Sequence, residues 1–584
     1  MNSTWNLDPI YKGFDDPAFA SDLKELERQV DAIVSLSARL PETEALAGLR
    51  EGIAIQEKIT KLVDKLANYA SLRQSADTRD PEAGSQMGRV MAVYSGIAAP
   101  QAVFQDWAAK LPNLMELASQ DETLKDYTFL LGKLKEGSRY LLSGSGEAVM
   151  ARMSLSGSNA WSDMQQYLTS TVRVNYRDTV TNLSAIRNMA YDPDPQVRKD
   201  AYEAELRCYP AIADPVAYAL NSIKLETISD CRLRGYASPL ERTLKHSDMK
   251  KETLDAMMGA IEEYLPRFHQ YLKIKASCLG HENGLPWYDL FAPMGNSSTR
   301  FTTRQARDYL VNLFAGFDGE LSRMIARAFD NAWIDFYPRD GKAGGAFCAG
   351  VECLGESRIL TNFDGMMGDV VTLAHELGHA FHNQCIRDQR PLNKDYSMPL
   401  AETASTFNEC VVMASAIRDA ASDAEKIALI ESQLQDATQI ICDILSRYLF
   451  ETAVFANREE QFMDASKLCD MMLTAQKAAY GDGLDPNCLH PYMWVCKSHY
   501  YGPTFYNFPY AFGGLFARGL YARYLQEGPS FVPKYKELLR TTTVATAEDT
   551  AKVAGIDLTD KDFWRSALQT IADQIDLFRS LENR

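Results

Sequence analysis

Two histidines four positions apart are the residues in this chain most clearly suited to chemistry. Residues 371–382 read Val-Thr-Leu-Ala-His-Glu-Leu-Gly-His-Ala-Phe-His, with the pattern His-Glu-x-x-His at His375, Glu376 and His379. On a helix, the two imidazoles lie one turn apart on one face and can bind one metal ion. Glu376 is rotated by about 100° around the helix, so its carboxylate lies beside the metal and can move a proton between water and a leaving amine.

The alternative interpretation is a helix that carries two surface histidines with no metal. Asp369 can cap the start of this helix, and apolar residues such as Val371, Ala374 and Leu377 fall on more than one side of it. The segment is therefore predicted to be a buried helix, which favours the metal site over the alternative.

A catalytic metal needs a third protein ligand and an open position. One known zinc-site pattern, His-Glu-x-x-His-x-x-Gly-x-x-His, takes its third ligand from a third histidine. It would require Gly at position 382 and His at position 385, but this chain has His382 and Cys385, so that pattern is excluded. A carboxylate from a following helix is the remaining source, and Glu402 and Glu409 lie seven residues apart on one helical face after Pro399. Two imidazoles and a carboxylate favour zinc, although cobalt or manganese could occupy the same ligands.

A second group of polar residues lies near the end of the chain. The stretch 499–514 reads His-Tyr-Tyr-Gly-Pro-Thr-Phe-Tyr-Asn-Phe-Pro-Tyr-Ala-Phe-Gly-Gly. His499, Tyr506 and Tyr510 could donate hydrogen bonds to the oxyanion that forms during peptide hydrolysis, with Tyr506 as the first candidate. The competing interpretation is an aromatic cluster that packs between helices, and Tyr500 and Tyr501 are assigned to packing.

Most of the chain has the periodicity of amphipathic helices. Helices are expected at 17–40, 49–72, 85–111, 195–234, 250–277, 303–330, 424–457, 464–479 and 561–581. Two stretches interrupt them, a Ser- and Gly-rich connection at 141–160 and the segment 341–363. The second is expected to form a β-hairpin directly before the His-Glu-x-x-His helix, with an edge to which an extended peptide could add.

The bulk composition indicates a soluble enzyme. A length of 584 residues predicts several lobes, and the net charge of −17 argues against nucleic-acid or anionic-membrane partners. The eleven cysteines have no regular spacing, which favours free thiols in a reducing compartment. The N-terminal residues do not have the pattern of a secretory signal, and no apolar run has membrane-spanning length. A cytoplasmic location is therefore expected.

The pattern His-Glu-x-Gly-His-x-x-His followed by Glu-x-x-Ser-x-x-x-Glu resembles the thimet oligopeptidase and oligoendopeptidase F family of metallopeptidases. The resemblance extends to the opening at 5–11, to the Gly-rich stretch 344–350 and to the stretch 499–514. It implies that Glu402 is the third zinc ligand, completing a site for one Zn²⁺ per chain. Glu409 would hold a ligand histidine, with an ordinary carboxylate on the helix face as the alternative. His382 would pack beside the ligands or support them rather than bind the metal. Gly345 and Ala346 would bind substrate together with Tyr510.

The resemblance also implies a fold and an activity. The expected fold is mainly α, with a deep channel between two lobes and a small β-hairpin beside the zinc-binding helix. We expect an N-terminal helical lobe at 1–190 and a catalytic domain at 191–584. The expected activity is zinc-dependent endopeptidase cleavage of short unfolded peptides by zinc-activated water, with Glu376 as general base and acid. The alternatives are a carboxypeptidase or dipeptidyl carboxypeptidase on the same scaffold, and a catalytically inert peptide-binding protein. Oligomeric state is left open.

Overall fold

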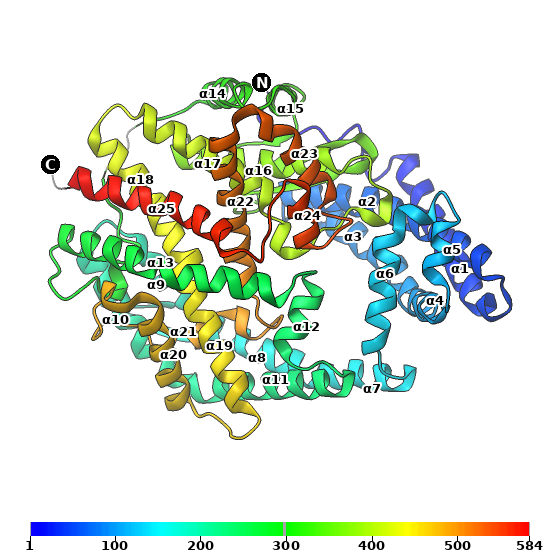
Figure 1. Cartoon of the computed structure of the whole chain (residues 1–584), viewed down its shortest axis with the longest axis horizontal. Coiled ribbons are helices and arrows are strands. Elements are labelled where there is room, and N and C mark those ends of the chain that lie inside the picture. The colour runs from blue at the N-terminus through cyan, green and yellow to red at the C-terminus, as the bar shows by residue number, and fades with distance from the viewer. Residues whose placement is uncertain (1, 296–298, 583–584) are drawn as a thin grey trace. The chain divides into compact units, whose positions relative to one another are not determined.

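The computed structural model describes residues 2–295 and 299–582, and these residues are mainly helical (Figure 1). They form two compact units, each assembled from separate stretches of the chain. Unit 1 contains the described residues up to Arg139, together with Thr299–Ser415 and Arg523–Gly555. Unit 2 contains the described residues of Tyr140–Ser298, Ala416–Ala522 and Ile556–Arg584. The mainly α fold is as expected, whereas the division at residue 190 stays a prediction.

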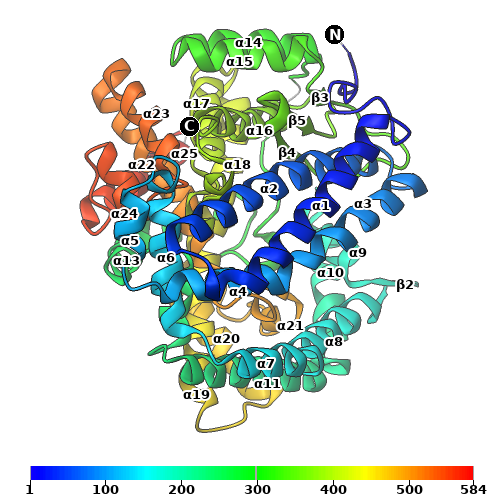
Figure 2. The same ribbon diagram turned by 90° about the vertical axis from the view of Figure 1, so that its right-hand side faces the viewer.

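Unit 1 begins with a layer of helices in which α1 and α2 lie side by side (Figure 2). Its elements are α1 (Pro17–Arg39), α2 (Ala45–Ala76), α3 (Pro81–Tyr94), α4 (Ala98–Lys110), α5 (Leu114–Ser119), α6 (Thr128–Gly137), α14 (Thr303–Ala315), α15 (Gly319–Asp330), β3 (Ile334–Asp335), β4 (Phe347–Val351), β5 (Glu356–Leu360), α16 (Met367–Cys385), α23 (Val532–Thr541) and α24 (Ala547–Val553). Two further helices, α17 (Thr403–Asp419) and α22 (Phe508–Glu527), have residues in both units.

Unit 2 is built around long helices, among which α13 and α25 pack along each other. Its elements are α7 (Gly144–Ser156), α8 (Ser158–Thr171), β1 (Arg173–Tyr176), β2 (Thr179–Asn182), α9 (Leu183–Asn188), α10 (Pro195–Cys208), α11 (Ala213–Arg234), α12 (Pro239–His246), α13 (Lys251–Cys278), α18 (Asp423–Thr438), α19 (Ile444–Arg458), α20 (Ala465–Tyr480), α21 (Met493–Cys496) and α25 (Lys561–Glu582). A π-helical turn, Gln439–Asp443, joins α18 to α19.

Local chemistry explains where several of these helices begin and end. Asp16 caps α1 by accepting a hydrogen bond from the amide of Ala18, and Pro17 occupies a first-turn position. The predicted helix 195–234 is two helices, because Pro210 lies in the short 3₁₀ turn between α10 and α11. The break in the helices expected at 141–160 is wrong, although the first stretch of unit 1 ends just before it, at Arg139. Ser143 caps a helix there, and Gly157 separates α7 from α8.

The predicted hairpin is present, and the helix that follows packs against both of its strands. β4 and β5 are antiparallel, with Phe347 opposite Leu360 and Val351 opposite Glu356. The short strand β3 pairs in parallel with β5, so the sheet order is β3-β5-β4 and β4 forms one edge. The N-terminal residues cover this sheet, because Trp5 packs against Phe347 with ring centroids 6.1 Å apart. A three-stranded sheet therefore supports α16 from one side.

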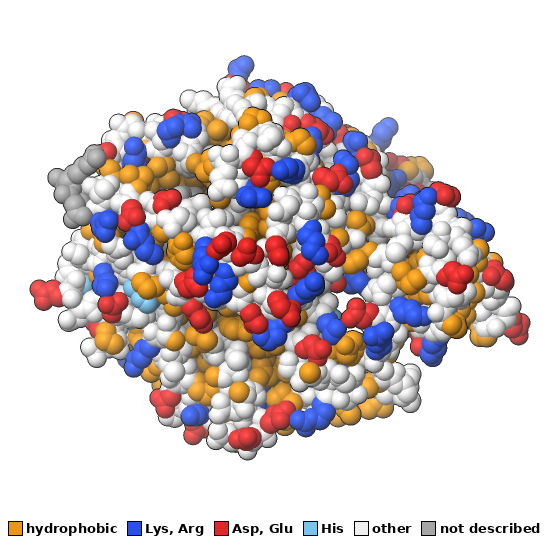
Figure 3. Space-filling view, viewed as in Figure 1, with side chains coloured by type: hydrophobic (Ala, Val, Ile, Leu, Met, Phe, Trp, Pro, Cys, Tyr) orange, Lys and Arg blue, Asp and Glu red, His pale blue; other side chains and the backbone are white. Residues whose placement is uncertain are grey.

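Charged residues are distributed without separation of sign on the face shown in Figure 3, where acidic and basic side chains are intermixed. Among the described residues, no helix combines the length and apolar character needed to cross a membrane.

Candidate active site

The helix α16 carries the His-Glu-x-x-His residues and is fixed at its start by Asp369. The Asp369 carboxylate accepts hydrogen bonds from the amides of Asp364 and Met366, at 3.0 and 2.9 Å. The buried face of α16 includes Leu373, Leu377 and Phe381, while His375 and His379 lie on another side of the helix. The apolar face therefore anchors the helix and leaves one stripe for the imidazoles.

Three side-chain atoms from His375, His379 and Glu402 form a nearly equilateral triangle. The two Nε2 atoms are 3.2 Å apart, and each lies 3.3 Å from Oε2 of Glu402. Ligands about 2.0–2.1 Å from a tetrahedral zinc ion are separated by about 3.3 Å, so this triangle has the size of one face of a zinc coordination tetrahedron. Among the described residues, these three form the group whose ligand atoms lie within 4.8 Å of one another. The donor set therefore fits a zinc ion.

A second carboxylate holds the imidazole of His375. The Nδ1 atom of His375 lies 2.5 Å from Oε1 of Glu409, which leaves Nε2 of the same ring as one corner of the triangle. Burial alone lowers the pKa of His375, but the carboxylates of Glu402 and Glu409 raise it to about 10. Ser405 donates a hydrogen bond of 2.7 Å to Glu402 Oε2. The ligand atoms are thus oriented by neighbouring polar groups.

Close packing of two helices brings Glu402 to the histidines. Glu402 lies in the turn just before α17, and Asn408 on that helix donates to the carbonyl of Ala374, at 3.0 Å. A Cβ atom at Gly378 would lie 2.5 Å from the carbonyl oxygen of Ala404 and 2.6 Å from Cα of Ser405. Glycine at position 378 is therefore required for this approach, which explains the Gly in the His-Glu-x-Gly-His pattern.

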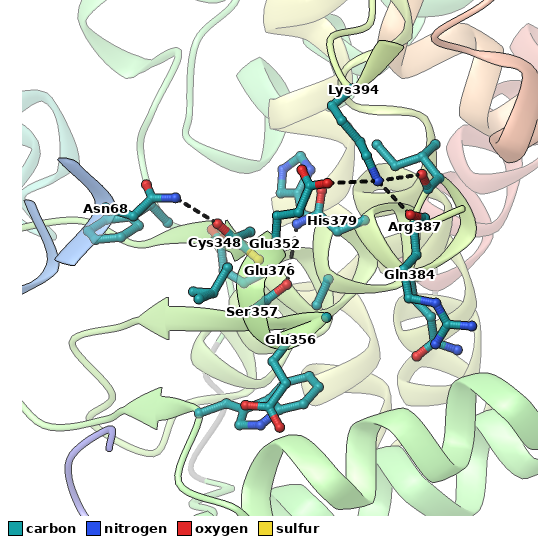
Figure 4. Close-up of a pocket in the computed structure, with 18 of the residues that line it drawn as sticks. Asn68, Cys348, Glu352, Glu356, Ser357, Glu376, His379, Gln384, Arg387 and Lys394 are labelled. Carbon is teal, nitrogen blue, oxygen red and sulfur yellow. Dashed lines mark hydrogen bonds and ion pairs between the residues drawn. The ribbon is translucent and has the colours of Figure 1, made fainter. Parts of the chain in front are cut away.

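A cavity of about 710 Å³ in unit 1 is lined by His375, His379 and Glu376, of which His379 and Glu376 are labelled in Figure 4. Glu376 is buried, and burial raises the pKa of its carboxyl group. Ala346 and β4 line the cavity, and Gly345 immediately precedes them with a positive φ of 76°. The amide of Asn68 on α2 donates to the carbonyl of Gly350, at 2.9 Å. A residue from the N-terminal helices therefore contacts the edge strand β4. Because Asn68 and Gly350 are far apart in sequence, no local sequence pattern predicts this contact.

His382 on α16 and Tyr396 beyond its end have surroundings that differ from those of the proposed ligands. His382 is fully buried, its Nε2 lies 2.8 Å from Oγ1 of Thr542, and its ring stacks on Tyr396 with centroids 4.5 Å apart. It is not part of the triangle. Tyr396 lines the cavity, and a lone tyrosine in a polar connection carries no sequence pattern that predicts this position.

The residues proposed from the second motif come together within unit 2. The ring of His499 stacks on Tyr506 with centroids 5.7 Å apart, and Tyr510 lies 6.0 Å from His499 and 5.5 Å from Tyr506. Tyr501 is buried and donates to the carbonyl of Trp494. The triangle of ligand atoms belongs to unit 1, and this aromatic cluster belongs to unit 2.

Two sequence profiles of known protein families match this chain. Residues 188–570 match the sequence profile described as peptidase family M3, and residues 109–173 match the profile described as oligopeptidase F. Since the first match covers more than half of the chain, the protein belongs to peptidase family M3 and is a metalloendopeptidase of the oligoendopeptidase F type.

Individual relatives extend over nearly the whole chain. Oligopeptidase PepF of Bacillus subtilis is 23% identical, with 99% of this chain and 87% of the relative covered. An oligoendopeptidase F homologue of Lactococcus lactis is 24% identical, with 98% and 96% covered. The solved oligoendopeptidase F of Enterococcus faecium has 17% identity and a TM-score of 0.72, covering 97% of this chain and 99% of its own. A structure of a candidate peptidase from Chlamydophila abortus has 20% identity and a TM-score of 0.87, covering 99% and 98%. These structures share the fold.

Proposed function

We propose that the protein is a zinc-dependent endopeptidase that hydrolyses short unfolded peptides, with His375, His379 and Glu402 as the zinc ligands. The observation that carries the proposal is the triangle of ligand atoms, with sides of 3.2, 3.3 and 3.3 Å. Zinc, when bound there, supplies a Lewis acid that polarises the scissile carbonyl and lowers the pKa of water.

Glu376 is the proposed general base and then the general acid. It follows a proposed ligand histidine in sequence and lines the same cavity, which supports a role in which its carboxylate takes the proton of the attacking water. Burial raises its pKa, which increases its affinity for that proton and suits delivery to the leaving nitrogen.

The substrate is proposed to bind as an extended strand along β4, beside Gly345 and Ala346. β4 ends the sheet, so part of its backbone is available to a peptide, and the cavity beside it reaches Glu376. His499, Tyr506 and Tyr510 are proposed to contact the substrate, with Tyr506 donating to the carbonyl oxygen as negative charge develops. The ring centroids of these three residues are 5.5–6.0 Å apart, which supports the proposal that they contact the same substrate.

A cytoplasmic location is part of the proposal. The support is that all eleven cysteines are free thiols, including several that are at least partly exposed. Free thiols are typical of a reducing compartment.

The test is hydrolysis of an internally quenched peptide of about ten residues with both ends blocked, a length suited to a substrate that binds as a strand. The native protein is expected to cleave the peptide. Cleavage is expected to stop when a chelator removes the metal and to return when zinc is added. Glu376→Gln is expected to retain zinc binding but to lose cleavage. Glu537→Gln, at a half-exposed ion-paired site of the same unit, serves as the control with unchanged activity. Zinc-loaded native protein that binds the peptide and leaves it intact would refute the proposal.

A further inference from the structure

A buried cluster in unit 2 has more positive than negative charge. The π-helical turn Gln439–Asp443 ends at a buried carboxylate, and Arg447 on the following helix α19 bonds to it through Nη2. Nζ of Lys497 lies 3.9 Å from the same Asp443 oxygen. Two cations therefore share one carboxylate, and only 11% and 21% of their side chains are exposed. An uncompensated charge of this kind is costly to bury without a counter-ion.

Several buried donors without protein partners lie near these charges. Among the residues that the structure describes, no acceptor lies within hydrogen-bonding distance of Nε of Arg447 or of the hydroxyl groups of Tyr480 and Tyr500. Nδ1 of His499 is likewise unpartnered. The two tyrosines are each 1% exposed. Buried polar groups almost always have a partner, so several orphaned donors near one charged cluster indicate an acceptor that is not part of the chain.

The charges of Arg447 and Asp443 act on the pKa of both phenols, so the two hydroxyl groups lie near the charged cluster. Tyr480 ends α20, which packs against the π-helical turn, and the amide of Tyr500 bonds to the carbonyl of Lys497 at 3.3 Å. Burial raises the pKa of both phenols well above 10, so each hydroxyl keeps a proton to donate. Burial and the charges of Arg447 and Lys497 lower the pKa of His499 to about 4, so its ring adds no further charge at neutral pH.

We propose that this cluster is a binding site for a small inorganic anion of the size of chloride, held by Arg447, Lys497, Tyr480 and Tyr500. A monatomic anion accepts several hydrogen bonds at once and neutralises the excess positive charge, whereas a water molecule satisfies donors without changing the charge. The site goes beyond peptide hydrolysis and does not depend on zinc or on Glu376.

The experiment measures chloride binding by the full-length zinc-loaded protein without peptide. Thermal unfolding is followed while sodium chloride replaces sodium gluconate at constant ionic strength, because gluconate is too large for a buried site. Ligand binding to the folded state raises the unfolding midpoint. The midpoint is expected to rise saturably, by at least about 2 °C. Line broadening of the ³⁵Cl NMR signal by native protein provides a direct second readout.

Variants assign the effect to the cluster. Tyr500→Phe and Tyr480→Phe each remove one donor and are expected to weaken chloride binding about tenfold, and Arg447→Gln is expected to abolish it. Tyr535→Phe is the matched control. It removes an equally buried and unpartnered hydroxyl group whose neighbours include the thiols of Cys385 and Cys410.

The outcomes separate clearly. Chloride dependence that is intact in Tyr535→Phe but reduced in both other phenylalanine variants supports the site, even if Arg447→Gln does not fold. No saturable dependence in the native protein, or the same dependence in all three phenylalanine variants, would overturn it. A peptide carboxylate has the same charge as chloride. Stabilisation that requires a peptide with a free C-terminus, and that is absent with its amidated form and with chloride alone, would also overturn the free-anion site.

Discussion

The Nδ1 atom of His375 and the Oε1 atom of Glu409 are 2.5 Å apart, so the imidazole is held from the side opposite the triangle of ligand atoms. Such a carboxylate fixes the tautomer and orientation of a ligand histidine and increases its basicity.

Replacement of Glu409 by Gln is therefore expected to weaken zinc binding about 10- to 100-fold. Competition with a chromogenic chelator measures the affinity. Asp388→Asn, which removes an exposed negative charge shortly after α16, is expected to leave the affinity unchanged. Equal losses in both variants would show that Glu409 acts through general charge rather than through its bond to His375.

Gly378 and Gly368 provide a matched pair on the same helix. A Cβ at Gly378 would meet the backbone of Ala404 and Ser405, whereas nothing lies within 4 Å of a Cβ built on Gly368. Gly378→Ala is expected to lower the free energy of unfolding by about 1–3 kcal/mol and to weaken zinc binding, because α16 and α17 must separate. Gly368→Ala is expected to be neutral or to stabilise by up to about 1 kcal/mol. Urea unfolding of both variants tests this, and a neutral Gly378→Ala would contradict the packing argument.

Burial lowers the pKa of His382 to about 3 in the folded protein. In the unfolded chain this imidazole has its ordinary pKa of about 6.5, so it binds a proton at a pH where the folded protein does not. The unfolded state therefore binds more protons between about pH 3 and 6.5, and stability falls as pH falls through this range. Near pH 5 this histidine contributes a slope of about 1.4 kcal/mol per pH unit. His382→Gln is expected to remove that part of the slope. Urea unfolding of metal-free protein measures it without a contribution from zinc release, and an unchanged slope would refute the assignment.

Tyr506→Phe tests the proposed oxyanion donor. Loss of a donor used mainly in the transition state is expected to lower kcat about 10²- to 10³-fold with little change in KM. Tyr501→Phe is the control, because its hydroxyl group already bonds to the carbonyl of Trp494. If Tyr510→Phe shows the large kcat loss and Tyr506→Phe does not, the donor is Tyr510.

Much of the site could be predicted because its determinants are local. The four-residue spacing of His375 and His379 requires only helix periodicity, and Asp369 caps the start of that helix as expected. Residue spacing alone did not choose between Glu402 and Glu409, since seven residues place both on one helical face. That choice came from the resemblance. In the structure, Glu402 lies in the turn before α17, 3.3 Å from both imidazoles, while Glu409 contacts the far nitrogen of one of them.

Features that depend on distant parts of the chain were not predictable. Asn68 reaches Gly350 across 282 positions, and no local pattern in α2 indicates this contact. The cluster of Asp443, Arg447 and Lys497 brings together residues about 50 positions apart, so its excess charge becomes apparent only after folding. The helix at Gly144–Ser156 was missed because Ser and Gly favour turns, although here Ser143 serves as a cap.

The late position of α23 in the chain affects how the protein is made. α16 packs against α23, and His382 bonds to Thr542, 160 positions further along the sequence. The ribosome therefore synthesises all three proposed zinc ligands well before it synthesises α23, the helix that packs against α16. A nascent chain that ends before Val532 contains the ligands without that helix. Since domains fold as units during synthesis, the proposed peptidase site gains its complete surroundings only after α23 has been synthesised.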